Sequence, residues 1–204
     1  MTEPKKTYSY LALGDSYTIG QSVMASENFP NQTVQLLNQQ NYNFKSPEIL
    51  ATTGWTTDEL QTNINNHVFT PPYDFVSLLI GVNNQYRGRT VENYKPEFES
   101  LLKQAIQFAG GNANRVIVVS IPDWGVTPFA NGRDRAQIAR EVDDYNAANK
   151  YISVIYKVNY IDITPGSREA ATDLSLVAGD GLHPSAKEYA RWAQKVFTAI
   201  KQQL

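Results

Sequence analysis

Short apolar runs alternate with longer amphipathic stretches along the chain, which is the pattern of strands alternating with helices. The runs that we expect to form strands are Tyr8–Leu13, Glu48–Ala51, Phe75–Ile80, Val116–Ser120 and Tyr160–Ile163. The clearest is Val116–Ser120, whose β-branched residues are typical of a central strand covered on both faces. The alternation therefore predicts an α/β fold with a parallel sheet and helices on both of its faces.

The stretches between these runs carry apolar residues at helical spacing. We expect helices at Phe29–Asn41, Asp58–Asn66, Val91–Phe108, Arg135–Tyr156 and from Ser185 to the end of the chain. Thr56 or Thr57 is available as the N-cap of the second helix, and His67 is expected at its other end as a surface residue. The stretch Ile121–Arg133 holds two prolines and two glycines and is expected to be a loop.

Composition narrows the class of protein. A chain of 204 residues without a linker or repeat is expected to form one domain over residues 1–204. Its net charge of −2, with no basic run beyond Lys5-Lys6, gives no electrostatic reason to bind nucleic acid. No segment approaches the roughly 18 to 20 apolar residues that span a bilayer, and Tyr8–Leu13 is too short for a signal-peptide core. We expect a soluble protein, either cytoplasmic or exported with its signal peptide removed.

Cofactor chemistry finds little support in the sequence. The absence of cysteine excludes disulfides, thiolate catalysis and Cys-ligated metals. The chain has two histidines, His67 and His183, and neither lies in a His-Glu-x-x-His or comparable zinc motif. The sequence therefore does not predict a zinc site. Glycine motifs for nucleotides are absent, as is the Gly-x-Ser-x-Gly pattern of α/β-hydrolases. We therefore expect chemistry that needs neither a metal nor an organic cofactor.

Two short motifs at opposite ends of the chain carry candidate catalytic groups. Gly14-Asp15-Ser16 follows the first predicted strand, where α/β sheets place their active sites, and Gly14 would allow a sharp turn there. Asp180 and His183 lie three residues apart before the last helix, a spacing at which the carboxylate can fix the imidazole tautomer. The structural alternatives are a turn capped by Asp15 or Ser16, and a helix-capping loop with an incidental histidine.

Two further loops follow predicted strands. Gly81-Val82-Asn83-Asn84 comes after the third strand, and an asparagine amide there can donate a hydrogen bond to an oxyanion, although a simple turn is the alternative. Gly54 follows the second strand and is a turn glycine by default, but its N–H can point into the same site. Because the carboxyl ends of parallel strands meet at one edge of a sheet, the four features converge, and this convergence favours catalysis.

The chain resembles the SGNH hydrolase superfamily, and within it the GDSL esterase/lipase family. The four blocks of that family are matched in order by Ser16, Gly54, Asn83 and His183. The resemblance implies a flavodoxin-like three-layer α/β/α sandwich with a five-stranded parallel sheet. The chain departs from the family at one position, since the third block commonly reads Gly-x-Asn-Asp and Asn84 stands in place of the Asp.

What the resemblance implies about activity is the hydrolysis of acyl esters through an acyl-enzyme intermediate. Ser16 would be the nucleophile, His183 the base and Asp180 the partner of the base. The Ser16 N–H, the Gly54 N–H and the Asn83 side chain would form the oxyanion hole. The partner would be a small-molecule ester, whether a simple acyl ester, a lipid or an acetylated sugar. A carbohydrate O-acetyl esterase, a lysophospholipase or thioesterase, and a non-catalytic glycan- or lipid-binding module remain alternatives.

Several residues near these motifs are candidate substrate contacts. Asp15 adjoins the nucleophile, and Tyr86 and Arg87 follow the third block, where an arginine can meet an anionic or sugar group. A solvated loop is an equally good interpretation of that segment. Trp124 and Phe129 follow the fourth predicted strand and would form either an acyl or leaving-group pocket or the packed interior of a long loop.

Overall fold

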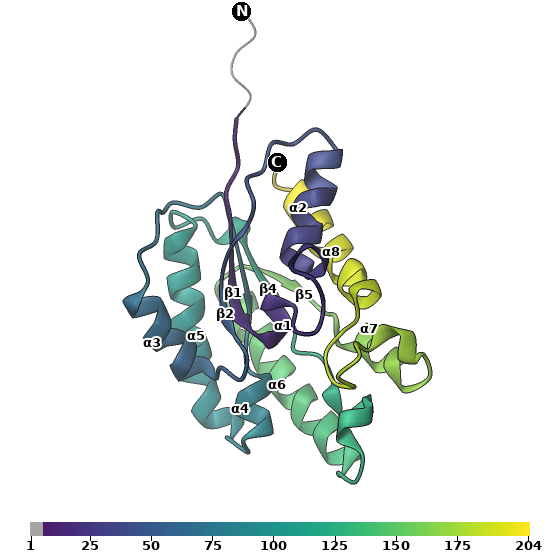
Figure 1. The fold of residues 1–204 in the computed structure, drawn as a ribbon. Helices are drawn as coiled ribbons and strands as arrows, with labels where there is room; N and C mark the ends of the chain where they lie inside the picture. Colours follow the sequence, from purple (N-terminus) through teal and green to yellow (C-terminus); the bar gives the residue numbers. More distant parts are fainter. Residues whose placement is uncertain (1–5) are drawn as a thin grey trace, which may run out of the picture.

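The computed structural model describes residues 6–204, and at its centre is a five-stranded parallel sheet (Figure 1). The strands are β1 (Tyr10–Asp15), β2 (Glu48–Thr52), β3 (Phe75–Leu79), β4 (Val116–Val119) and β5 (Asn159–Ile161). They lie in the order β2-β1-β3-β4-β5, which is the flavodoxin-like order. The predicted fold class is therefore confirmed. In this topology the winding reverses between β1 and β3, and ligands bind beyond the carboxyl ends of the strands at that point.

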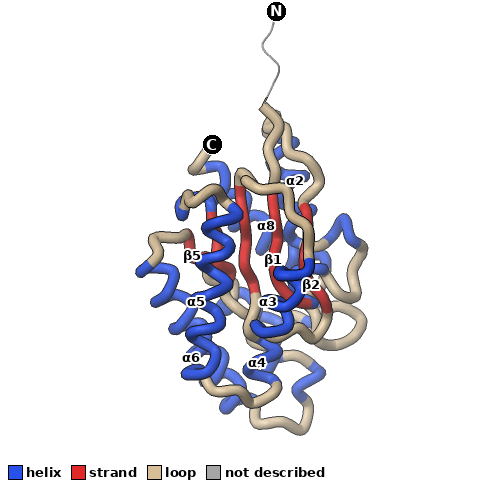
Figure 2. Tube along the Cα trace, turned by 90° about the vertical axis from the view of Figure 1, so that its left-hand side faces the viewer, coloured by secondary structure: helices blue, strands red, loops and turns tan. Residues whose placement is uncertain are grey.

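Helices cover both faces of the sheet. They are α1 (Ser16–Ile19), α2 (Phe29–Gln39), α3 (Thr57–Asn66), α4 (Val82–Tyr86), α5 (Val91–Phe108), α6 (Arg135–Ile155), α7 (Thr164–Ser167) and α8 (Ala186–Lys201). Figure 2 shows α3, α5 and α6 in front of the strands, with α2 and α8 together behind them. Short 3₁₀ turns occupy Ala25–Glu27, Ala113–Arg115, Trp124–Val126, Pro128–Ala130, Arg168–Ala171 and Leu174–Leu176. None of the helices in residues 6–204 has the length and apolar character needed to cross a membrane.

The five predicted strands and the five predicted helices are all present, with ends that differ by up to three residues. The important difference is at the first strand, which runs to Asp15 because Gly14 and Asp15 pair with Ala51 and Thr52 of β2. Ser16 consequently follows the strand directly. The prediction missed α1, α4 and α7, which have only four or five residues each and so show no helical period.

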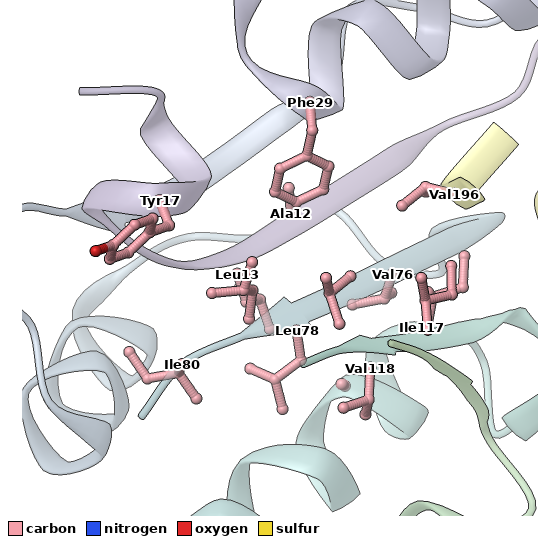
Figure 3. Packing of buried hydrophobic residues seen from close by; sticks show 14 of the residues in the cluster. Ala12, Leu13, Tyr17, Phe29, Val76, Leu78, Ile80, Ile117, Val118 and Val196 are labelled. Atoms are coloured by element: carbon pink, nitrogen blue, oxygen red, sulfur yellow. The ribbon is translucent and has the colours of Figure 1, made fainter. Parts of the chain in front are cut away.

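The sheet is the centre of the hydrophobic core. Every residue of β1, β3 and β4 is buried. In Figure 3, Phe29 of α2 lies over Ala12 of β1. Leu13, Leu78 and Val118, which are in register on adjacent strands, point to the opposite face of the sheet. Each fully buried side chain of this size contributes about 1.5–3 kcal/mol. The strand ends are therefore a rigid platform for the loops that follow them.

Gly14 is required by close packing, and the expectation that it makes a sharp turn is wrong. It lies inside β1 and is not among the glycines with positive φ. A Cβ at this position would lie 2.1 Å from Thr18 Oγ1 and 2.5 Å from the Leu79 carbonyl oxygen. The missing side chain lets α1 and the end of β3 approach β1, and this approach holds Ser16 at the edge of the sheet.

Candidate active site

Ser16, His183 and Asp180 form a continuous hydrogen-bonded chain at the carboxyl edge of the sheet. Ser16 is the first residue of α1, and His183 lies in the loop before α8. His183 Nε2 is 2.9 Å from Ser16 Oγ, and His183 Nδ1 is 2.6 Å from Asp180 Oδ2. Because a carboxylate only accepts hydrogen bonds, the neutral imidazole donates from Nδ1, which leaves Nε2 free to accept the serine proton. The fold thus brings the two end motifs into contact.

Four hydrogen bonds hold the Asp180 carboxylate. Oδ1 accepts from the backbone N–H groups of Leu182 and His183, each at 3.0 Å, and Oδ2 accepts from His183 Nδ1 and from Ser22 Oγ at 2.6 Å. Partial burial opposes ionisation, but the bonds from Ser22, His183 and the two amides outweigh it and hold the pKa of Asp180 well below its usual range. Sequence reasoning missed Ser22, because nothing local connects it with a carboxylate 158 residues away.

A pocket of about 150 Å³ opens beside Ser16. Seven residues predicted for the site line it: Ser16, Gly54, Asn83, Tyr86, Trp124, Phe129 and His183. The remaining wall is formed by Tyr17, Thr53, Val82 and Leu182, none of which the sequence singled out. Most of these side chains are apolar, so the pocket suits an apolar group held next to a serine hydroxyl.

Gly54 and Asn83 lie on the rim of this pocket and supply the candidate oxyanion donors. Gly54 has a φ of 84°, which side chains rarely adopt, although the nearest atom to an added Cβ would be 3.9 Å away. Conformation and not space therefore demands glycine. The Asn83 amide nitrogen is 3.0 Å from the Trp55 carbonyl oxygen and 3.4 Å from Asp15 Oδ2. The longer bond is weak, so one amide N–H can turn toward an oxyanion.

Arg87 does not line the pocket, which corrects its prediction as a substrate contact. Its Nη2 donates to the Gly54 carbonyl oxygen at 2.7 Å, and its Nη1 is 3.2 Å from Glu59 Oε1. The guanidinium is thus engaged by the protein itself. It ties the Gly54 loop to α3 and to the end of α4.

Asp15 is also corrected, because it is fully buried and outside the pocket lining. Its Oδ1 accepts from the Tyr17 N–H at 3.0 Å, so Asp15 is the N-cap of α1. A capping role for Asp15 was the alternative to catalysis that the sequence offered. Burial raises the pKa of Asp15 to about 7, against the opposing effect of hydrogen bonds from Tyr17 and Asn83. Asp15 is therefore a structural residue: it caps the helix that begins at Ser16, and its other carboxyl oxygen contacts the Asn83 amide.

We expect the free energy of unfolding of Asp15→Asn to increase relative to that of the wild type as the pH rises. The folded carboxyl keeps its proton up to about pH 7, whereas in the unfolded chain it loses the proton near pH 4, its ordinary pKa being about 3.9. Between these values the folded state binds more protons, so wild-type stability falls as the pH rises. The asparagine amide does not titrate, so the variant does not lose stability in this way as the pH rises.

Urea unfolding at about pH 5 and about pH 8 measures the effect, and the difference between variant and wild type should grow by on the order of 2 kcal/mol. Asp144→Asn, on α6, is the matched control. A difference that is the same at both pH values would contradict the buried, protonated Asp15.

Asn84, the departure from the third block, is a structural link. It is fully buried, its Oδ1 accepts from the Thr57 N–H at 3.1 Å, and its Nδ2 donates to Thr57 Oγ1 at 2.6 Å. The Thr57 hydroxyl in turn donates to Glu97. A neutral amide can donate and accept at once, and here it joins α4 to the first turn of α3. The position of the neighbouring Asn83 depends on this link.

Trp124 is buried in its loop and also lines the pocket. Its indole Nε1–H donates to Gln85 Oε1 at 2.7 Å, which fixes the ring. Tyr86 and Phe129 are 43% and 42% exposed, so they form the outer rim. The loop predicted over Ile121–Arg133 is present, and two 3₁₀ turns give it a defined path.

Within residues 6–204, no group of three or more His, Asp or Glu side chains is placed so that it could hold a metal ion. His67 lies at the end of α3, as predicted, and its Nε2 is 2.8 Å from Glu48 Oε1. Glu48 begins β2, so this pair lies at the amino end of the sheet, away from the pocket.

Comparison with known proteins defines the class. The model of the GDSL-like lipase/acylhydrolase family matches residues 12–191. The chain belongs to this family and is an ester hydrolase of the GDSL type. No curated protein sequence matches the chain significantly.

Solved structures share the fold at low sequence identity. Similar chains include the esterase EstA from Pseudoalteromonas sp. (15% identity, TM-score 0.72, covering 96% of this chain and 97% of that chain). The acetylxylan esterase Axe2 from Geobacillus stearothermophilus is another (19% identity, TM-score 0.75, covering 95% and 94%). The lipase/acylhydrolase from Enterococcus faecalis is a third (20% identity, TM-score 0.71, covering 97% and 97%). At these identities the likeness shows a common fold.

Proposed function

We propose that this protein is a serine esterase that hydrolyses carboxylic esters of short acyl groups through a Ser16–His183–Asp180 triad. The observation that carries the proposal is the hydrogen-bonded chain from Asp180 through His183 to Ser16, which ends at an apolar pocket. A nucleophile, a base and a residue that orients the base are the three parts that acyl transfer by serine requires.

In the proposed first half-reaction, Ser16 Oγ attacks the ester carbonyl carbon while its proton passes to His183 Nε2. The negative charge that develops on the carbonyl oxygen is accepted by the Ser16 N–H, the Gly54 N–H and the Asn83 amide. Asp180, ionised at neutral pH, stabilises the imidazolium that forms. The C–O bond to the alcohol then breaks, the alcohol leaves with the proton from Nε2, and the acyl group remains on Ser16.

In the second half-reaction, water attacks the acyl-enzyme. His183 Nε2 takes a proton from this water, and the same three donors hold the second oxyanion. Collapse of the intermediate releases the carboxylic acid and returns the proton to Ser16 Oγ. Every step uses only these side chains, the Ser16 and Gly54 backbone N–H groups and water. The small apolar pocket supports a short acyl group as the part of the substrate held beside Ser16.

Labelling with a fluorophosphonate tests the proposal. Ser16 Oγ should form the bond to phosphorus as fluoride leaves and His183 takes the proton, so peptide mass spectrometry should find the adduct on Ser16. Asn83→Ala should be labelled about 10²-fold more slowly, because the phosphonyl oxygen loses one donor. Asn93→Ala, an exposed asparagine of α5, is the matched control and should react at the wild-type rate. A folded wild-type protein that is not labelled would instead favour a non-catalytic glycan- or lipid-binding module.

A further inference from the structure

Three aromatic side chains, Tyr86, Trp124 and Phe129, form part of the pocket wall and contact one another. The ring centroids of Tyr86 and Trp124 are 5.3 Å apart, and that of Phe129 is 6.1 Å from Tyr86 and 6.0 Å from Trp124. Trp124 is buried and bonded to Gln85, so its position is fixed. Tyr86 is 43% exposed at the end of α4, and its own neighbours bury it only in part.

A single arginine holds this aromatic group together. The Arg133 guanidinium carbon lies 5.0, 5.3 and 5.7 Å from the ring centroids of Tyr86, Trp124 and Phe129, within the range of cation–π attraction. Its Nη2 also donates to the Tyr86 hydroxyl at 3.1 Å. The arginines that form ion pairs within residues 6–204 are Arg87, Arg89, Arg115, Arg168 and Arg191. Arg133 is not one of them, so the aromatic group is its main contact.

Tyr86 and Trp124 separate two cavities, and we call this pair the partition. On one side is the 150 Å³ pocket with Ser16. On the other is a larger open cavity of about 350 Å³, lined by the partition, by Arg133 and by polar residues of α4 and α6. Arg133 belongs to the second cavity only, so it braces the outer face of the partition. Figures 1 and 2 show α4, which ends at Tyr86, next to α6, which begins two residues after Arg133.

We propose that Arg133 is a positioning residue that sets the acyl-chain length by holding Tyr86 against Trp124. With the partition closed, the acyl group has only the small pocket, which favours chains of a few carbons. When Tyr86 is released, the pocket opens into the larger cavity and longer chains fit. This inference rests on the proposed esterase function, and it adds the residue that decides between short and long acyl esters.

The test compares p-nitrophenyl acetate with p-nitrophenyl octanoate. In Arg133→Ala the ratio of kcat/KM for octanoate to that for acetate should rise by about tenfold over the wild type. This is the low end of what an added methylene gives in an apolar pocket, because the second cavity is lined largely by polar residues. Arg133→Lys keeps a cation over the rings but loses the planar fork, and should restore part of the wild-type ratio. Tyr86→Ala removes half of the partition and should raise the ratio at least as far as Arg133→Ala.

Arg140→Ala, an exposed arginine of the same helix region, is the matched control and should keep the wild-type ratio. A parallel series of acetate esters with longer alcohols should show no change in any variant, because the proposal places only the acyl chain against the partition. An unchanged acyl ratio in both folded Arg133→Ala and folded Tyr86→Ala, or a change in the alcohol series instead, would overturn the inference while leaving the esterase intact. A wild-type protein inactive on every ester contradicts the proposed function, and this inference with it.

Discussion

Ser16→Ala is expected to lower kcat for p-nitrophenyl acetate by about 10⁵-fold or more, because the proposed mechanism has no second nucleophile. His183 Nε2, which is 2.9 Å from the hydroxyl in the wild type, would have no proton to accept. Water in the vacated space could still be activated by the imidazole, and the oxyanion donors would remain, so a small residual rate above that of water is expected. Stopped assays at high enzyme concentration measure it.

The folded state should hardly change in Ser16→Ala. The side chain is buried at the first position of α1, but the N-cap of that helix is Asp15, whose bond to Tyr17 the replacement leaves intact. Thermal unfolding should therefore be within a few degrees of the wild type, since small changes of this kind cost about 1 kcal/mol. Ser100→Ala, at an exposed position of α5, controls for the loss of a hydroxyl. Substantial esterase activity in the folded Ser16→Ala variant would remove Ser16 from the mechanism.

Asp180→Asn is expected to lower kcat by about 10⁴-fold, through the tautomer of His183. The amide oxygen must take the place of Oδ1, which accepts from the Leu182 and His183 N–H groups. The opposite orientation would set an amide N–H₂ against two N–H donors. The amide nitrogen consequently faces His183 Nδ1 and donates to it. Nε2 then carries the proton, faces the Ser16 hydroxyl as a donor, and cannot act as a base.

The direct readout for Asp180→Asn is the imidazole itself. Nitrogen-15 NMR of the His183 ring should show the proton on Nδ1 in the wild type and on Nε2 in the variant. The rate of fluorophosphonate labelling should fall in parallel with kcat. Asp144→Asn, an exposed aspartate on α6, is the control and should change neither quantity. A variant with the wild-type tautomer and full activity would show that Asp180 does not orient the base.

Ser22 and Arg87 both hold residues of the candidate site in place through hydrogen bonds. Each is outside the pocket lining, and each bonds a residue of the candidate site: Ser22 the Asp180 carboxylate, and Arg87 the Gly54 carbonyl oxygen. Such partners keep reacting groups in place before substrate arrives, which is where much of the electrostatic part of catalysis originates. The arrangement explains why the loop after α1 and the loop after β2 lie against the site.

The amino-acid sequence by itself determined the fold class, the five strands and the long helices. These follow from burial patterns that repeat every two or 3.6 residues, and such patterns are local. Parallel strands also place their carboxyl ends at one edge, so the convergence of Ser16, Gly54, Asn83 and His183 could be predicted from their positions after strands and before the last helix. The resemblance to the family was carried by the same four positions, and the family model matches residues 12–191.

Only the tertiary structure decided what the neighbouring side chains do. Asp15 and Arg87, which the sequence suggested as substrate contacts, face the protein, and Ser22 and Arg133 entered the description through contacts across long stretches of chain. A hydrogen bond or a stacked guanidinium depends on the path of two loops to within about 1 Å, and no periodicity encodes that path. The sequence thus specifies where the chemistry gathers, and the packing of the loops specifies which groups reach the substrate.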